Sequence, residues 1–307
     1  MKIQHLCPRR VFLLACLLHS AEAVILVDPV HNTCGAQGSS TVQGLLTDVT
    51  NLAQHALNSM NSLDNGQSSG WDFYRTVVTF DSFFDATSPG AQTRWNDVKS
   101  NLGTMAAAPS TTRNVYVSCD DSALWTQAQD GTLTFNDPSN GQSYPGYSTA
   151  TTKRCADPVI INGTPNTQIG YRIQINNIEF VQLCLKQNGG DILLNQLSLA
   201  EGNNLDDETT LSTVLFHELT HALIDTMRGD STGGQAAGGE RYGWGGAQQV
   251  RSTYAVENPD SLTLYTLAMA LTPYLWNTGK ALSTVSEYQR LQQNEPQTIR
   301  NLNLPSS

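Results

Sequence analysis

Two histidines four residues apart, His217 and His221, constrain this chain more than any other feature of its sequence. They lie in a segment whose apolar residues recur at helical spacing, and Thr209 or Thr210 can cap its start. On a helix, two side chains at this spacing lie on one side, about 40° apart around the axis and one turn apart. Two imidazoles in this arrangement can bind a single tetrahedral Zn²⁺. We therefore predict a metal-binding helix that ends near Arg228.

Glu218 follows the first histidine and completes the pattern H-E-x-x-H. On a helix its carboxylate projects beside the histidines, where it can take a proton from a water molecule without being a ligand itself. Only four histidines follow residue 23, and two of them belong to this motif. The pattern predicts a zinc-dependent endopeptidase with one Zn²⁺ per chain, Glu218 as its general base, and proteins or peptides as substrates.

A catalytic zinc usually has three protein ligands. A histidine six residues after the motif is excluded, because Met227 stands there. The downstream carboxylates are Asp225, Asp230, Glu240 and Glu257. Asp225 lies one turn beyond His221 on the same helix, whereas a third ligand must approach from a separate segment, so we discount it. The last, with Asp260 three residues on, fits a gluzincin arrangement in which a second helix supplies a glutamate ligand and an aspartate orients one histidine. Asp230 and Glu240 lie in a glycine-rich connection after the helix, which can fold back under the metal.

The first 23 residues have the pattern of a secretory signal peptide. A basic start precedes a short apolar run at residues 11–18, which is too short to span a bilayer, and Ala21-Glu22-Ala23 is a small-x-small cleavage site. We expect the remaining residues, 24–307, to form one domain, because no linker divides them. The expected location is extracellular.

The charge of the chain argues against two classes of partner. The full sequence has 17 basic and 27 acidic residues, a net charge of −10; without residues 1–23 the balance is 14 − 26 = −12. Such an acidic protein is repelled by nucleic acids and by anionic membranes. We therefore expect no nucleic acid and no membrane among its partners.

Four cysteines follow the expected signal peptide, namely Cys34, Cys119, Cys155 and Cys184. An even number in an oxidising compartment predicts two disulfides, and three pairings are open. No two of the four have the C-x(2–4)-C spacing of a structural zinc site. Asn162-Gly163-Thr164 is an acceptor for N-glycosylation, which predicts a glycoprotein.

The rest of the chain reads as a mixed α+β protein. Helical periodicity predicts helices over residues 39–60, 93–107 and 247–276, the last with a break at Asn258-Pro259. Short β-branched or aromatic runs predict strands at 75–80, 114–118, 158–161, 171–175 and 179–186. Residues 120–157 are polar and rich in turn formers, which indicates long surface loops with room for a hairpin.

Several segments resemble the aspzincins, the deuterolysin-like zinc peptidases that fungi secrete. In that family H-E-x-x-H precedes a Gly-Thr-x-x-Asp-x-x-Tyr-Gly turn and then a helix with Asn-x-Asp-Ser-Tyr. This chain has Tyr242-Gly243-Trp244, then Asn258-Pro259-Asp260-Ser261 and Tyr265. Looser matches extend the similarity from about residue 32 to 285, including Asn32-Thr33-Cys34 and Trp71-Asp72-Phe73-Tyr74.

The resemblance implies a zincin-like fold, in which a small twisted sheet packs on long helices and the metal helix forms the floor of the cleft. It implies two histidines and an aspartate as ligands, the motif glutamate as base, and the turn tyrosine, Tyr242, as a transition-state donor. The aspartate has no direct counterpart, because Gly239 stands three residues before Tyr242. Glu240 is one position nearer and one methylene longer. We expect Glu240 as third ligand, with Asp230 and Glu257 as alternatives.

A rival function is a secreted zinc-binding or antigen-like protein that keeps the fold without the reaction. The altered third ligand would fit such a protein. Glu218 argues for the enzyme, because metal binding alone does not require that carboxylate.

Overall fold

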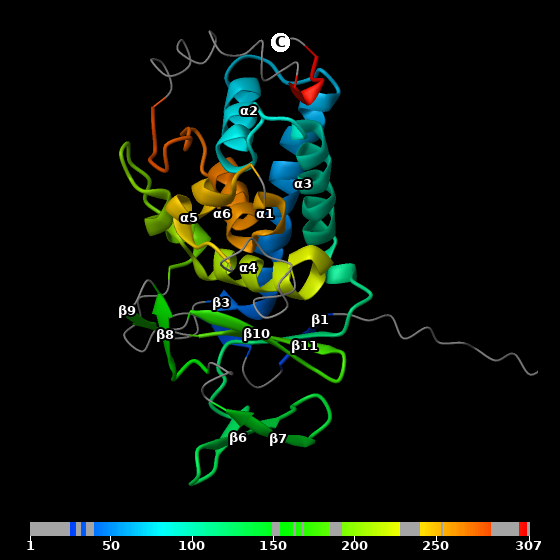
Figure 1. Cartoon of the computed structure of the whole chain (residues 1–307), viewed down its shortest axis with the longest axis vertical. Helices are drawn as coiled ribbons and strands as arrows, with labels where there is room; N and C mark the ends of the chain where they lie inside the picture. The colour runs from blue at the N-terminus through cyan, green and yellow to red at the C-terminus, as the bar shows by residue number, and fades with distance from the viewer. Residues whose placement is uncertain are drawn as a thin grey trace, which may run out of the picture.

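A computed structural model describes residues 25–28, 32–34, 40–148, 154–161, 164–167, 169–184, 192–227, 240–252, 254–283 and 301–305, with only the backbone for 158–161 and 164–167. Three predictions lie outside these residues: the signal peptide, the glycosylation acceptor Asn162, and the alternative ligand Asp230. Within the described residues no helix is both long and apolar enough to cross a membrane. The elements are mixed, as expected of an α+β protein (Figure 1).

Three long helices follow one another in the first part of the chain. Helix α1 spans Val42–Asp64, α2 spans Gly70–Phe84 and α3 spans Ala91–Ala106. Thr41 caps α1 by accepting a hydrogen bond from the Gly44 amide at 3.1 Å, as a threonine before a helix commonly does. The predicted helices at 39–60 and 93–107 are thus confirmed.

The strand predicted at residues 75–80 is wrong, because these residues lie in the middle of α2. Ten of the 15 residues of this helix are buried, including the polar residues Arg75, Thr76 and Thr79, and the β-branched and aromatic run within it favoured a strand. Its β-branched and aromatic side chains fill a space between helices; Phe80, for example, lies edge-on against Trp95 with ring centroids 4.8 Å apart. Tertiary packing has overridden local propensity here.

A four-stranded sheet lies under the helices (Figure 1). Its order is β1 (Ile25–Val27), β4 (Val115–Ser118), β11 (Ile178–Leu183) and β10 (Gly170–Ile175). The first three strands run parallel, whereas β10 pairs antiparallel with β11 and forms the edge. These strands confirm the predictions at 114–118 and 171–175. The strand predicted at 179–186 is confirmed as far as Leu183, and residues 185–186 lie outside the described residues.

A second sheet covers the face of the first that is turned away from the helices. It is antiparallel and contains β5 (Trp125–Gln127), β6 (Thr132–Asn136) and β7 (Ser143–Ser148). Tyr116 and Phe180 alternate along their strands with residues of the main core and pack instead with Trp125 and Phe135 of the second sheet. The segment predicted as loops with room for a hairpin therefore holds an additional small core. Two short pairs complete the strands, β2 (Thr33–Cys34) with β3 (Ser40–Thr41) and β8 (Pro158–Ile161) with β9 (Thr164–Thr167).

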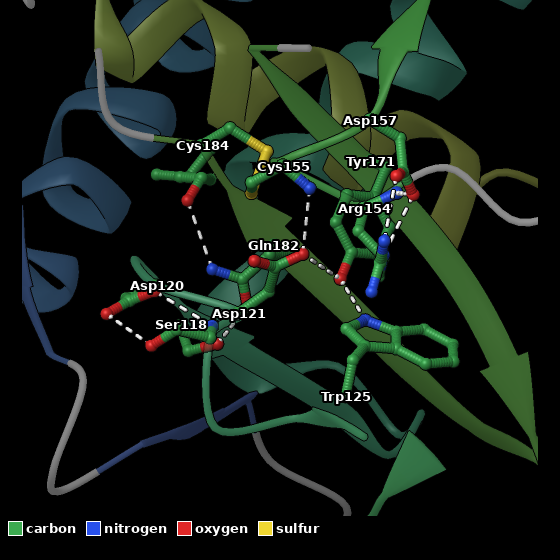
Figure 2. Close-up of a disulfide and its surroundings, with 12 residues drawn as sticks. Ser118, Asp120, Asp121, Trp125, Arg154, Cys155, Asp157, Tyr171, Gln182 and Cys184 are labelled. Carbon is green, nitrogen blue, oxygen red and sulfur yellow. Dashed lines mark hydrogen bonds and ion pairs between the residues drawn. A yellow bond between two sulfur atoms is a disulfide. The ribbon is translucent and has the colours of Figure 1, made fainter. Parts of the chain in front are cut away.

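The cysteines pair as Cys34–Cys119 and Cys155–Cys184, with Cα atoms 5.5 and 5.1 Å apart. Two disulfides were predicted, but the pairing was open. Beside the second disulfide, Asp121 accepts hydrogen bonds from the Cys155 amide at 2.8 Å and from the Tyr171 hydroxyl at 3.0 Å (Figure 2). These bonds connect the segment after β4 to β10.

The C-terminal helices pack above the sheet. Helix α4 spans Leu211–Leu223 and lies on β10 and β11, with a short 3₁₀ turn, η5, at Asp225–Met227 (Figure 1). Then follow α5 (Gly243–Val250), the turn η6 (Ala255–Glu257) and α6 (Pro259–Ala270). The predicted helix over 247–276 is therefore wrong at both ends, although its break before Pro259 is confirmed. The early start matters for function, because α5 begins directly after Tyr242.

Candidate metal centre

His217 and His221 lie on α4 and face the same side of it. Thr210 caps this helix, because its hydroxyl accepts a hydrogen bond from the Thr213 amide at 3.2 Å. Of the two threonines predicted as caps, Thr209 and Thr210, the second is therefore the cap. The two imidazole rings have centroids 5.1 Å apart and lie at 71° to each other. The helix ends at Leu223, slightly before the predicted end near Arg228.

Glu240 approaches both histidines from the segment that leads into α5. Its Oε1 lies 3.0 Å from His217 Nε2, and its Oε2 lies 3.5 Å from His221 Nε2. One ligand atom from each of these residues lies within 4.8 Å of the others, and among the described residues they form the group that could hold a metal ion. The three side chains are 12, 10 and 4% exposed.

The chemistry of this group fits a zinc ion. Two imidazole nitrogens and one carboxylate oxygen are a common protein ligand set of catalytic zinc. Ligand atoms at bond lengths of about 2.0–2.1 Å in a tetrahedron are separated by about 3.3 Å, and each oxygen of Glu240 lies near that distance from one imidazole nitrogen, at 3.0 and 3.5 Å. Glu240 Oε1 is also buried and, besides the His217 ring nitrogen at 3.0 Å, has no hydrogen-bond partner among the described residues, which is costly unless a cation is near. The group could therefore hold a metal.

The other nitrogen of each ring is held by a neighbouring oxygen. His221 Nδ1 lies 2.6 Å from the Met227 carbonyl, and since a carbonyl only accepts, this nitrogen donates. His217 Nδ1 lies 3.2 Å from Asp260 Oδ1 on α6. Both contacts leave Nε2 directed at Glu240, as expected of imidazoles that bind a metal. Met227 stands where a histidine ligand was excluded, and its backbone carbonyl instead orients the ring of His221.

The end of α4 is fixed by Arg113, which lies just before β4. Its guanidinium donates to the Ala222 carbonyl at 3.0 Å and pairs with Asp225 at 2.8 Å. A cation at a helix C-terminus is favourable because the last carbonyls lack partners. Asp225, the carboxylate discounted as a ligand, is therefore turned to this arginine. The arrangement holds the turn that presents the Met227 carbonyl.

Charges within the cluster shift the pKa of its members in opposite directions. Burial lowers the pKa of His217, but the Glu240 charge and hydrogen bonds with Asp260 and Glu240 outweigh it and raise that pKa well above its usual value. The pKa of His221 is also raised, because its bond to Glu240 outweighs burial. The pKa of Glu240 falls far below its usual value, since the histidines outweigh its own burial. The carboxylate is thus ionised, as a ligand must be, whereas the two histidines would have to release their protons for a metal to bind.

Glu218 lies on α4 between the ligands and is 8% exposed. Its charge contributes to the raised pKa of both histidines. Strand β10 passes close to it: a Cβ added at Gly170 would lie 3.1 Å from Glu218 Oε1 and 2.8 Å from Val214 Cγ1. Gly170 therefore allows the edge strand to approach this carboxylate, and the sequence offered no pattern that marked it.

Tyr242 lies against the same cluster. Its ring stacks on His217 at 6.0 Å and 21°, and its hydroxyl donates to Glu240 Oε2 at 2.8 Å. Although Tyr242 is 54% exposed, the burial of its hydroxyl beside the cluster and the Glu240 charge raise the pKa of this phenol well above its usual value, so it remains a hydrogen-bond donor. Asn258 holds the preceding residue by accepting from the Arg241 amide at 3.1 Å and donating to its carbonyl at 3.0 Å.

The structure brings together five of the residues selected from the sequence: His217, Glu218, His221, Glu240 and Tyr242. Glu257, the gluzincin alternative, lies in η6 and is not part of the metal-binding group. Asp260 does orient a histidine, the role that it was given only in that alternative. No family model matches this chain, and no curated protein is significantly similar to it. The functional argument therefore rests on this geometry.

Proposed function

We propose that this protein is a zinc-dependent endopeptidase with a zincin-like fold of the aspzincin type. The observation that carries the proposal is the convergence of His217, His221 and Glu240, with Glu218 and Tyr242 at its border. A small sheet packed against the helix that carries both histidines also fits such a fold. Two disulfides favour an extracellular location, where oxidising conditions maintain them.

The chain's own residues would divide the work of hydrolysis. A zinc ion held by the three ligands would lower the pKa of a water molecule and polarise the scissile carbonyl. Glu218 takes the proton of the attacking water and gives it to the leaving amine nitrogen. The Tyr242 hydroxyl donates a hydrogen bond to the oxygen of the carbonyl as negative charge develops on it.

The position of β10 favours a peptide as the substrate. Among the described residues this strand is an edge of the four-stranded sheet, and it passes Glu218 at Gly170. An extended peptide can add to such an edge as a further strand, held by main-chain hydrogen bonds. A substrate bound there would run past the general base, which places a backbone carbonyl near the cluster. The chain's acidity disfavours nucleic acid as a partner.

Hydrolysis of casein by the purified protein tests this proposal. The zinc-loaded wild type should cleave casein, a chelator should stop cleavage, and added zinc should restore it. Glu218→Gln should abolish cleavage while zinc stays bound, because Glu218 is the base and not a ligand. Glu201→Gln is the matched control, since this exposed glutamate accepts a hydrogen bond from Ser283 elsewhere on the surface. Zinc-loaded protein without any casein cleavage would favour the rival, a binding protein.

A further inference from the structure

Two carboxylates from distant segments meet at the first turn of α5. Asp260 Oδ2 accepts a hydrogen bond from the Gly243 amide, and Asp206 Oδ1 accepts one from the Trp244 amide at 2.7 Å. These amides are the first two of the helix, so neither has an acceptor within α5. Asp206 lies in the turn η4 (Leu205–Glu208), which precedes the metal helix. The mutual influence of the carboxylates is seen in the pKa of Asp206, which burial and then the charge of Asp260 raise.

Asp206 is itself held in place by backbone pairing. The Leu205 amide donates to the Gly279 carbonyl at 2.8 Å, and Asn204 and Lys280 form an isolated antiparallel bridge. Trp244 lies over Gly279, where an added Cβ would approach the indole to 2.6 Å. The ring of Trp244 meets Phe83 of the core edge-on, with centroids 5.0 Å apart. The turn is thus fixed on one side by a packed indole and on the other by the two carboxylates.

The backbone conformation between Tyr242 and Trp244 is tightly restricted. Gly243 has φ +70°, which disfavours any other residue, and a Cβ there would lie 3.1 Å from Asp206 Oδ2. Tyr242 directly precedes this glycine, so the direction of its side chain depends on how the first turn of α5 is held. We propose that Asp206 is a positioning residue that, through the Trp244 amide, holds the Tyr242 hydroxyl at the metal cluster. The catalytic part of this inference rests on the proposed function.

Amide hydrogen exchange tests the hydrogen bond from the Trp244 amide to Asp206, here called the clamp, and does not depend on activity. In the full zinc-loaded protein, Asp206→Ala should remove the protection of the Trp244 amide, whereas the Gly243 amide, held by Asp260, stays protected. Asp206→Asn keeps a carbonyl acceptor and should preserve most of the protection at Trp244. Asp207→Ala is the control, because this exposed neighbour accepts instead from Asn204. Unchanged exchange at Trp244 in Asp206→Ala would overturn the proposal.

Peptide kinetics test the consequence for Tyr242. Asp206→Ala should lower kcat about 10- to 100-fold, the scale of a misplaced catalytic group, with KM and zinc affinity little changed. In a Tyr242→Phe background the same substitution should have almost no further effect, because the hydroxyl that it positions is gone. Independent, multiplying effects would show that Asp206 does not act through Tyr242. If the wild type cleaves no peptide, the proposed function fails, while hydrogen exchange still decides whether the clamp exists.

Discussion

Glu240 reaches the histidines from a position where the aspzincin pattern has no ligand. A glutamate is one methylene longer than an aspartate, and here both of its oxygens contact the histidines, at 3.0 and 3.5 Å. The sequence could suggest this residue because it lies two positions before Tyr242. The sequence could not suggest that the Met227 carbonyl orients His221, because every residue type has a backbone carbonyl. Asp206 was missed for a related reason, since its partner is also a backbone group.

Tyr242→Phe separates the hydroxyl from the ring. Phenylalanine keeps the ring that stacks on His217 and all three proposed ligands, so zinc should still bind, although the bond from the hydroxyl to Glu240 Oε2 is lost. The donor to the developing oxyanion is lost, and kcat should fall about 10²- to 10³-fold. Steady-state kinetics with a fluorogenic peptide, together with zinc affinity, measure both effects. A kcat equal to that of the wild type would show that the hydroxyl has no catalytic role.

Helix α2 shows most clearly why elements cannot all be read from a sequence. Arg75 belongs to the run mistaken for a strand, yet its side chain is buried and donates to the Met269 carbonyl at 2.8 Å near the end of α6. Phe73, Val77 and Phe80 do recur at helical spacing, but the short run of β-branched and aromatic residues favoured a strand over the helix. In contrast, α1 and α4 each carry a threonine cap and, in their spacing, an apolar stripe, so their starts were predictable.

The bond network beside Cys155–Cys184 gives a prediction for stability. The Tyr171 hydroxyl accepts from Trp125 Nε1 at 2.8 Å and donates to Asp121 at 3.0 Å (Figure 2). Tyr171→Phe leaves a buried indole N–H and a carboxylate without this partner, and should lower the free energy of unfolding by about 1–3 kcal/mol. Urea denaturation measures the loss. Tyr254→Phe, at an exposed tyrosine, should change it by less than about 0.5 kcal/mol.

The same network predicts a pH dependence. Burial, followed by the charge of Asp121, raises the pKa of Tyr171 well above its usual value. A phenol whose folded pKa exceeds the unfolded value of about 10 contributes its full stability below that pH and loses it as the pH rises further. The stability of Tyr171→Phe should therefore decline less than that of the wild type above about pH 10. An equal decline in both proteins would contradict this assignment.

The candidate metal site connects three parts of the molecule that are far apart in the chain. The ligands come from α4 and from the segment before α5, and Asp260 adds α6. A sequence motif identifies the first of these parts, but only the folded chain shows that the others converge on it. Such a site, if it binds metal in the folded state alone, must stabilise the whole fold.

Removal of zinc should therefore lower the melting temperature. At a free zinc concentration 100-fold above Kd, binding contributes about 2.7 kcal/mol, which corresponds to a shift of several degrees. Calorimetry with and without a chelator measures it. Glu218→Gln should keep the shift, because it retains all three ligands, whereas the double variant His217→Ala, His221→Ala should show none. A chelator effect that persists in the double variant would place the metal elsewhere.

The zinc affinity of single carboxylate variants tests the central claim most directly. Competition with a chromogenic chelator gives the zinc Kd of the wild type and of Glu240→Ala, Asp230→Ala and Glu257→Ala. The account predicts that Glu240→Ala weakens zinc binding at least about 100-fold, because a true ligand is lost, and that the other two variants stay close to the wild type. A large loss confined to Glu257→Ala or to Asp230→Ala would contradict it and move the third ligand to that residue.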